Sequence, residues 1–203
     1  MKVLFIGNSH TYTHYVPLRT AAFSMAMGHP LEATMLTQGG MGLDWHLQQH
    51  QTRYNLVYGG YDAVILQHLA HPFPGREALL KAGKALAEIV PANTKRYVYM
   101  TWSEKNNPQG QDAMCEACEA LAREIGAEVC PVGRIWQQVR SAHPETELYG
   151  DDGEHSSVLG ASLAASVIGR TLLGMEVTAE ICLEEAQQLA QFPEDPRLSM
   201  HTI

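Results

Sequence analysis

Short apolar runs alternate along the chain with longer stretches in which apolar residues recur at helical spacing. The runs contain β-branched and aromatic residues and stop at turn-forming residues, which is typical of buried strands. We expect strands at residues 3–6, 31–36, 61–67, 96–102 and 128–131. The stretches between them predict helices at residues 16–27, 43–51, 75–90, 111–124, 134–142, 157–173 and 179–190.

This alternation predicts an α/β fold in which helices connect parallel strands. We expect a single-domain, three-layer α/β/α architecture with a five-stranded, mostly parallel sheet in the flavodoxin-like order 2-1-3-4-5. A chain of 203 residues suits one domain, 1–203. The last residues, roughly 10 to 15 of them, contain prolines and charges and are expected to form a loosely ordered tail. Ligands of such a sheet bind beyond the carboxyl ends of its strands, between strands one and three.

The composition is that of an ordinary folded protein, with 45% hydrophobic and 18% charged residues. The formal net charge of -8 disfavours nucleic acid and anionic membrane surfaces as partners, so a small neutral molecule fits better. No apolar stretch has the length of a signal peptide or of a membrane span. We therefore expect a cytoplasmic protein.

The first predicted strand ends in Gly7-Asn8-Ser9, so a serine stands at the carboxyl end of a central strand. A nucleophile is useful at this edge because ligands bind there. A serine hydroxyl is a weak nucleophile and needs a neighbouring base to take its proton. The alternative interpretation of these residues is an ordinary turn followed by a helix cap.

A matching base stands far along the chain, in Asp152-Gly153-Glu154-His155. An aspartate three residues before a histidine can direct its carboxylate at the imidazole, which supplies the orienting group and the base of a serine triad. We therefore expect Ser9, His155 and Asp152 to be catalytic. Glu154 is expected to face solvent, and Asp151 is the alternative carboxylate.

These motifs resemble those of the SGNH (GDSL-like) hydrolase family. Gly7-Asn8-Ser9 is similar to its nucleophile block and Asp152 to His155 to its D-x-x-H block, while Gly39-Gly40 stands where the family has its oxyanion-hole glycine. The resemblance extends from residue 3 to about residue 170. The chain departs from the family in Asn8, where Asp is usual, and in His10, where Leu is usual. No Gly-x-Asn-Asp block follows the third strand.

The resemblance implies a serine esterase that forms an acyl-enzyme, with the backbone N–H groups of Ser9 and Gly40 stabilising the oxyanion. The implied substrates are small esters, in particular O-acetyl groups on carbohydrate, and no cofactor is implied. The glycines among residues 39–42 fit a backbone that approaches a ligand closely. A flexible loop explains them equally well.

The third oxyanion donor of the family has no direct counterpart in this chain. Gln67 is the first polar residue at the end of the third predicted strand, and its primary amide has N–H donors of the same kind as Asn. We predict that Gln67 completes the oxyanion hole. The alternatives are that Gln67 caps the strand and bonds only backbone, or that His71 is the donor.

Four ring-bearing residues, His10, His68, His71 and Trp102, are predicted to lie near the same edge of the sheet. Imidazole and indole rings at this edge would suit stacking on a sugar ring, which makes these residues candidates for substrate binding. Plain packing at the strand ends is the alternative explanation.

Ten histidines also raise the alternative of a metal-dependent hydrolase. His46 and His50 are spaced as in H-E-x-x-H, but Leu47 stands where that motif has its glutamate, and no carboxylate completes a ligand set. We expect no metal site. Cys115 and Cys118 form a C-x-x-C inside a predicted helix and are expected to be reduced structural thiols. A further alternative is a ligand-binding module on the same fold that does not catalyse.

Overall fold

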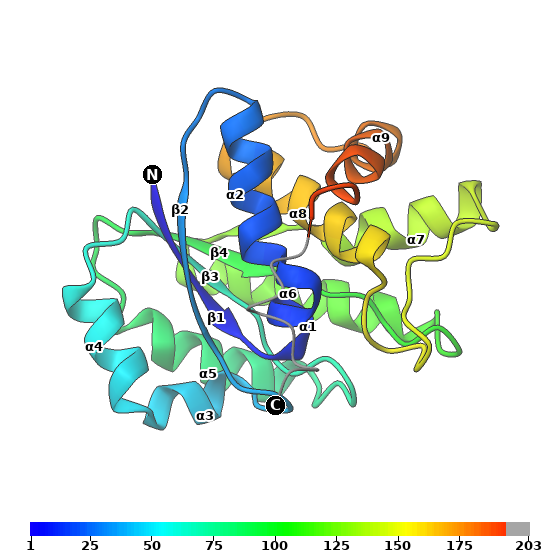
Figure 1. Cartoon of the computed structure of the whole chain (residues 1–203). Coiled ribbons are helices and arrows are strands. Elements are labelled where there is room, and N and C mark those ends of the chain that lie inside the picture. The colour runs from blue at the N-terminus through cyan, green and yellow to red at the C-terminus, as the bar shows by residue number, and fades with distance from the viewer. Residues whose placement is uncertain (194–203) are drawn as a thin grey trace, which may run out of the picture.

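A five-stranded parallel sheet runs through the middle of the molecule, with helices on both of its faces (Figure 1). The computed structural model describes residues 1–193. The strands are arranged in the order β2-β1-β3-β4-β5, and every neighbouring pair is parallel. This confirms the predicted α/β class and strand order. The predicted tail falls largely on residues 194–203, outside the described residues. The strands are β1 (Lys2–Gly7), β2 (Glu32–Thr37), β3 (Ala63–Leu66), β4 (Lys95–Tyr99) and β5 (Glu128–Cys130).

Strand β1 is buried on both faces, and its side chains alternate between two hydrophobic cores. Val3 and Phe5 belong to one core, whereas Leu4 and Ile6 belong to the other. None of the four exposes any surface. This two-sided burial explains why the strand reads as a continuous apolar run.

The first core lies under one helical layer, in which α8 is buried along almost its whole length. Small residues let α8 pack closely against its neighbours α2, α7 and α9. A Cβ on Gly169 of α8, for example, would lie 2.3 Å from the ring of Phe23 of α2. The helices of this layer are α2 (Val16–Ala26), α7 (Val132–Ala142), α8 (Val158–Leu172) and α9 (Ala179–Leu189).

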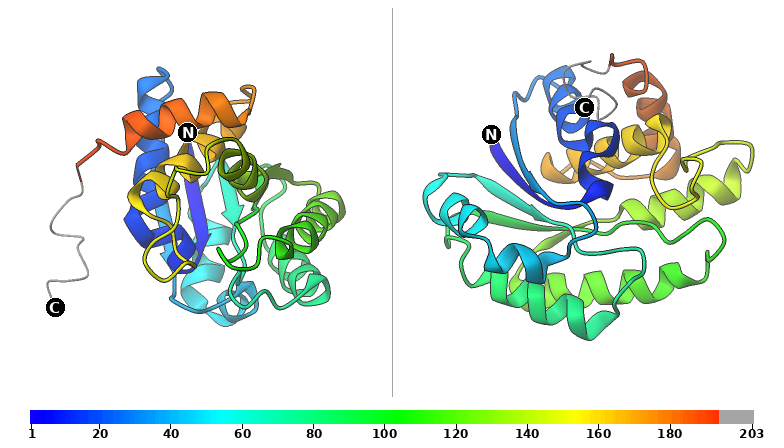
Figure 2. Two further views of the ribbon diagram at one scale, coloured as in Figure 1. Left: turned by 90° about the vertical axis from the view of Figure 1, so that its right-hand side faces the viewer. Right: turned by 60° about the horizontal axis from the view of Figure 1, so that its bottom comes forward.

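The second core lies between the sheet and the opposite helical layer, and Figure 2 shows the sheet between the two layers. Among residues 1–193, no helix combines the length and the apolarity that crossing a bilayer requires. The helices of the second layer are α3 (Leu43–Gln48), α4 (His50–Tyr58), α5 (Arg76–Ala87) and α6 (Gly110–Ile125).

Three segments differ from the prediction. The single helix expected at residues 43–51 is two helices, because Gln49 adopts an extended conformation (φ -85°, ψ 125°) between α3 and α4. Strand β4 ends at Tyr99, so Trp102 lies in the loop that follows it. Directly after β1 the chain forms two short elements that the sequence did not predict, α1 (Ser9–Tyr12) and the 3-10 helix η1 (Thr13–Tyr15).

The carboxyl ends of β1, β2 and β3 meet at one edge of the sheet. Gly7 pairs with the last residue of β2, and Ile6 pairs with the last residue of β3. Backbone hydrogen bonds continue past the strands, from Gln38 N–H to Gly7 O (3.1 Å) and from Gln67 N–H to Ile6 O (2.9 Å). Ser9, the glycine loop after β2 and Gln67 therefore gather at this edge, where the strand order changes direction.

Candidate active site

Ser9, His155 and Asp152 meet at the carboxyl edge of the sheet. Ser9 Oγ lies 2.7 Å from His155 Nε2, and His155 Nδ1 lies 2.6 Å from Asp152 Oδ2. Because the carboxylate can only accept, Nδ1 carries the imidazole proton and Nε2 is left to accept the proton of the Ser9 hydroxyl. The structure thus brings together the three residues that the sequence singles out, in the order that proton transfer requires.

The loop between α7 and α8 is folded around the Asp152 carboxylate. Asp152 Oδ1 accepts the backbone N–H groups of Glu154 and His155, each at 2.9 Å. Gly153 has a φ of 71°, a backbone conformation that favours glycine. Burial would raise the pKa of Asp152, but the hydrogen bond from the His155 ring and those from the two backbone N–H groups lower it to about 2. Asp152 is therefore an anion at neutral pH, whereas Asp151 is exposed and Glu154 faces solvent as expected.

A buried amide holds the turn that carries Ser9. Gln67 Oε1 accepts the backbone N–H of Asn8 (2.8 Å) and the hydroxyl of Thr11 (3.0 Å). A Cβ at position 7 would lie 2.4 Å from this same Oε1, so a glycine is needed to leave room for the contact. Gly7 of the Gly-Asn-Ser motif is thus explained by the close approach of Gln67 to the turn.

Gln67 lies at the end of β3, but its amide is engaged inside the protein. The side chain has no exposed surface, and Nε2 donates to the carbonyl oxygen of His68. Turning the amide over would set its NH₂ group against the Asn8 N–H, so the network fixes its orientation. This geometry argues against the predicted donation to an oxyanion. It favours the alternative of bonding to backbone, although Gln67 also accepts the Thr11 hydroxyl. His71, the other candidate donor, is also engaged, because its Nε2 lies 3.0 Å from Trp102 O.

His46 has a role that the sequence analysis missed. It is buried, and its Nε2 lies 2.7 Å from Gly7 O, the carbonyl that also accepts Gln38 N–H. Burial lowers the pKa of His46, so the ring is neutral and donates through its single N–H. His50 is exposed at the start of another helix, so the supposed histidine pair on one helix does not exist.

Asn8 uses both halves of its amide at the turn. Its Oδ1 accepts the backbone N–H of His10 (3.1 Å) and caps α1, while its Nδ2 donates to Met41 O (3.0 Å). An aspartate, usual at this position in the family that the motif resembles, could make only the first of these bonds. The second bond links the glycine loop to the turn that carries Ser9.

Ser9 and Gly40 each have a backbone N–H without an acceptor among the described residues. Ser9 is the first residue of α1, where helical N–H groups lack intrahelical partners. Gly40 is exposed and has a φ of 69°, which turns the loop after β2. Both groups are available for the predicted oxyanion role, which stays a prediction.

The aromatic candidates for sugar binding are more deeply buried than expected. Trp102 has no exposed surface and stacks on Trp136, with ring centroids 3.9 Å apart. His10 and His68 expose only 5% and 8% of their surface. The idea that these three rings stack on a sugar is therefore corrected, because protein already covers them. His71 is half-exposed and borders solvent.

Within residues 1–193, no three His, Cys, Asp or Glu side chains gather as a metal ion would require. Cys115 and Cys118 are buried free thiols. Burial raises the pKa of both, that of Cys118 to about 12, so they are protonated and unreactive at neutral pH.

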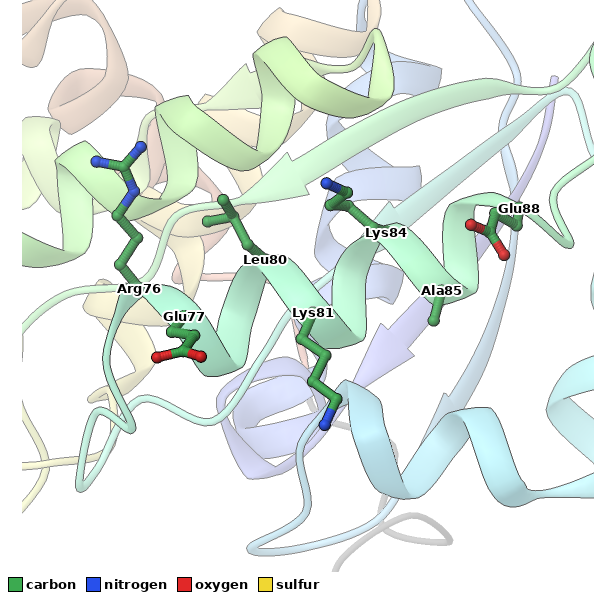
Figure 3. A pocket seen from close by; sticks show the side chains of 7 residues that line it. All are labelled: Arg76, Glu77, Leu80, Lys81, Lys84, Ala85 and Glu88. Atoms are coloured by element: carbon green, nitrogen blue, oxygen red, sulfur yellow. The ribbon is translucent and has the colours of Figure 1, made fainter.

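Two surface hollows lie beside α5 and beside the Asp152 loop. The one of about 430 Å³ borders Asp152 and is lined mainly by residues 104–106 and 151–154. The other, of about 750 Å³, follows α5, from which charged side chains project (Figure 3). Lys84 in this second hollow is ion-paired with Glu124 of α6 at 2.5 Å. None of the triad residues lines it, and we assign it no function.

Many solved structures with the fold of this chain are GDSL/SGNH family esterases and lipases. No protein-family model matches the chain, and no curated protein matches its sequence. Solved structures do share its fold. A DUF4886 family protein from Bacteroides uniformis ATCC 8492 is 18% identical, with a TM-score of 0.72 over 94% of this chain and 93% of that one.

Two further structures carry functional descriptions. A member of the lipolytic protein G-D-S-L family from Veillonella parvula DSM 2008 is 13% identical, with a TM-score of 0.65 over 85% of this chain and 97% of that one. A variant of Axe2, an acetyl xylan esterase from Geobacillus stearothermophilus, is 14% identical, with a TM-score of 0.65 over 87% of this chain and 96% of that one. At these identities the likeness establishes the fold.

Proposed function

We propose that the protein is a serine esterase that works through an acyl-enzyme. The observation that carries the proposal is the 2.7 Å contact between Ser9 Oγ and His155 Nε2, on an imidazole whose other nitrogen is bonded to the Asp152 carboxylate. Such an arrangement makes a serine hydroxyl nucleophilic, because the base is in place to take its proton. The esterases and lipases that share the fold support the same reaction class.

In the first half-reaction, Ser9 Oγ attacks the acyl carbon while its proton passes to His155 Nε2. The Asp152 anion stabilises the imidazolium that forms, and the N–H groups of Ser9 and Gly40 stabilise the negative charge on the carbonyl oxygen. When the tetrahedral intermediate collapses, the bond to the alcohol breaks and the alcohol oxygen takes the proton from His155. The acyl group remains on Ser9.

In the second half-reaction, water replaces the alcohol. It attacks the acyl carbon and gives its proton to His155, and the carboxylic acid leaves as Ser9 Oγ takes that proton back. Each proton removed is therefore returned. No group beyond the triad, the backbone donors and water takes part.

The proposed substrates are small neutral esters, in particular O-acetyl groups on carbohydrate. One structure with this fold is an acetyl xylan esterase, which supports an acetyl ester as substrate. The acidic residues Glu104, Asp151, Asp152 and Glu154 line the hollow beside Asp152 together with one cation, Lys105. This excess of negative charge and the formal net charge of -8 favour a neutral over an anionic ester.

The direct test compares p-nitrophenyl acetate, butyrate and octanoate, together with acetate release from acetylated xylo-oligosaccharides. We expect the acetate to be the best of the three simple esters, and Ser9→Ala to lower kcat by roughly 10⁴-fold or more. Exhaustive chelation should leave the rate unchanged. Activity that disappears on chelation and returns with a divalent metal would contradict the proposal, and a preference for octanoate would contradict the small-ester assignment.

A further inference from the structure

The catalytic imidazole packs against another histidine, His10, which directly follows the nucleophile. The two rings are nearly parallel, with centroids 5.1 Å apart and an interplanar angle of 26°. The His155 side chain is 33% exposed, whereas His10 is 5% exposed. The base therefore has solvent beside part of its surface and the fixed ring of His10 against one face.

His10 is itself held by two further aromatic residues. Its ring meets His71 edge to face (centroids 4.6 Å, 74°) and lies at a tilt against Trp102 (5.3 Å, 51°). His10 Nε2 lies 3.0 Å from His71 Nδ1, and His71 Nε2 lies 3.0 Å from Trp102 O. These contacts fix the orientation of the His10 ring.

The direction of these hydrogen bonds sets both tautomers. Trp102 O can only accept, so His71 donates through Nε2, and its Nδ1 is left as an acceptor. His10 must then donate from Nε2 to His71, so its own Nδ1 carries no proton when the ring is neutral. That Nδ1 lies 3.3 Å from Asn8 Oδ1, the longest of the three contacts.

The charge states of His10 and His71 follow from the surroundings of their rings. Burial lowers the pKa of His10 well below 6.5, and the neighbouring His71 and His155 lower it further, against the Glu154 carbonyl and the Asp152 anion, which raise it. Burial also lowers the pKa of His71, with opposing contributions from the Trp102 carbonyl and from the Glu104 and Glu154 carboxylates. Both rings are neutral at neutral pH, so neither competes with His155 for the Ser9 proton.

We propose that His10 is a positioning residue whose neutral ring, anchored through His71 to Trp102 O, holds the His155 imidazole against Ser9. This inference rests on the proposed function, because it assigns His10 a role in the same reaction. The ring face of His10 packs on the base that becomes an imidazolium in the proposed reaction. Stacked aromatic pairs contribute to packing beyond the area they bury, and a small displacement of a reacting group can cost about 10²-fold in rate.

Two variants of His10 separate the ring from its hydrogen bond. His10→Phe keeps an aromatic ring against His155 but loses the donor to His71, whereas His10→Gln keeps an N–H donor but has no ring. We expect His10→Phe to retain kcat within about tenfold of the wild type and His10→Gln to lose about 10²-fold. KM for p-nitrophenyl acetate should change little in either, and His50→Ala is the exposed control.

His71 gives a test that leaves the buried ring in place. His71→Gln can still accept from His10 and donate to Trp102 O, whereas His71→Ala can do neither. We expect activity near the wild-type level in the first and a kcat lowered by at most about tenfold in the second, as in His10→Phe, which loses the same bond. Wild-type kcat in His10→Gln and His71→Ala would overturn the inference while leaving the proposed function intact. Wild-type activity in Ser9→Ala would instead overturn the proposed function itself.

Discussion

The two oxygens of the Asp152 carboxylate have different hydrogen-bond partners. One carboxylate oxygen accepts from the ring and the other from two backbone N–H groups, so the same side chain fixes both the tautomer of the base and the loop that presents it. We therefore expect the rate losses of His155→Ala and Asp152→Asn to be strongly non-additive, because each removes the same catalytic unit. Steady-state kinetics of the two single variants and the double variant measure this. A double loss equal to the product of the two single losses would refute the shared role.

A variant of Gln67 separates a structural role of this side chain from a catalytic one. Its Oε1 accepts from Asn8 N–H and Thr11, so Gln67→Ala leaves a buried backbone donor unsatisfied, which costs about 1–3 kcal/mol in the free energy of unfolding. We expect both a lower Tm and a lower kcat. Thermal melting and steady-state kinetics of the same Gln67→Ala preparation measure the two quantities. An unchanged Tm with a kcat lowered by roughly 10²-fold would instead restore Gln67 as the oxyanion donor of the original prediction.

Ser9, Asp152 and His155 could be singled out from the sequence because each signal is local. The serine directly follows a predicted strand, and the aspartate stands three residues before the histidine. The role of His46 could not be predicted, because its bond to Gly7 O joins residues far apart in the sequence and no residue spacing indicates it. Trp102 was placed correctly near the strand ends, but its burial depends on stacking with Trp136. Burial of this kind is a tertiary property.

At the scale of elements, α8 gives the sharpest prediction. Gly169 lies against the ring of Phe23, and an added Cβ would meet it at 2.3 Å, so Gly169→Ala forces α2 and α8 apart. We expect a loss of about 1–3 kcal/mol in the free energy of unfolding, measured by urea denaturation. Glu184→Ala, at an exposed position of α9, is the control and should stay within about 0.5 kcal/mol of the wild type. A Gly169→Ala variant as stable as the control would mean that the two helices are not so closely packed.

Most helices and all five strands were predictable from apolar spacing, while the breaks between elements were less so. Gln49 has an extended backbone that separates α3 from α4, and no Gly or Pro beside it indicates this break in the sequence. The short helix α1 begins at Ser9 and is capped by the Asn8 side chain, which agrees with the alternative interpretation of Gly7-Asn8-Ser9 as a turn followed by a helix cap.

At the scale of the whole molecule, three buried histidines and the partly buried His71 couple stability to pH. Burial lowers the pKa of each, so on acidification below about pH 6.5 the unfolded chain takes up protons that the folded chain does not, and the unfolded state is favoured. The Asp152 carboxyl adds a second loss at lower pH, as the pH falls from 3.8 towards 2. The histidines are His10, His46, His68 and His71.

We therefore expect Tm to be nearly constant above about pH 7 and to fall as the pH decreases through 6 and 5. Thermal melts followed by circular dichroism across this range measure the effect. His50→Ala should show the same dependence, because its side chain is exposed. A Tm that rises on acidification would contradict the neutral state assigned to the buried rings.

The strand order was also predictable at this scale, since alternating strands and helices in a chain of this length leave few topologies. The three residues of the triad come from opposite ends of that topology, at the end of β1 and in the loop before α8.

Covalent labelling of Ser9 tests the central claim most directly. Intact protein is treated with a fluorophosphonate and its mass is measured, with Ser9→Ala and the exposed-serine variant Ser141→Ala treated in parallel. We predict a single adduct on the wild type and on Ser141→Ala, located at Ser9 by peptide mapping, and none on Ser9→Ala. An adduct that persists in Ser9→Ala, or a wild-type protein that hydrolyses esters but is never labelled, would contradict the assignment of Ser9 as the nucleophile.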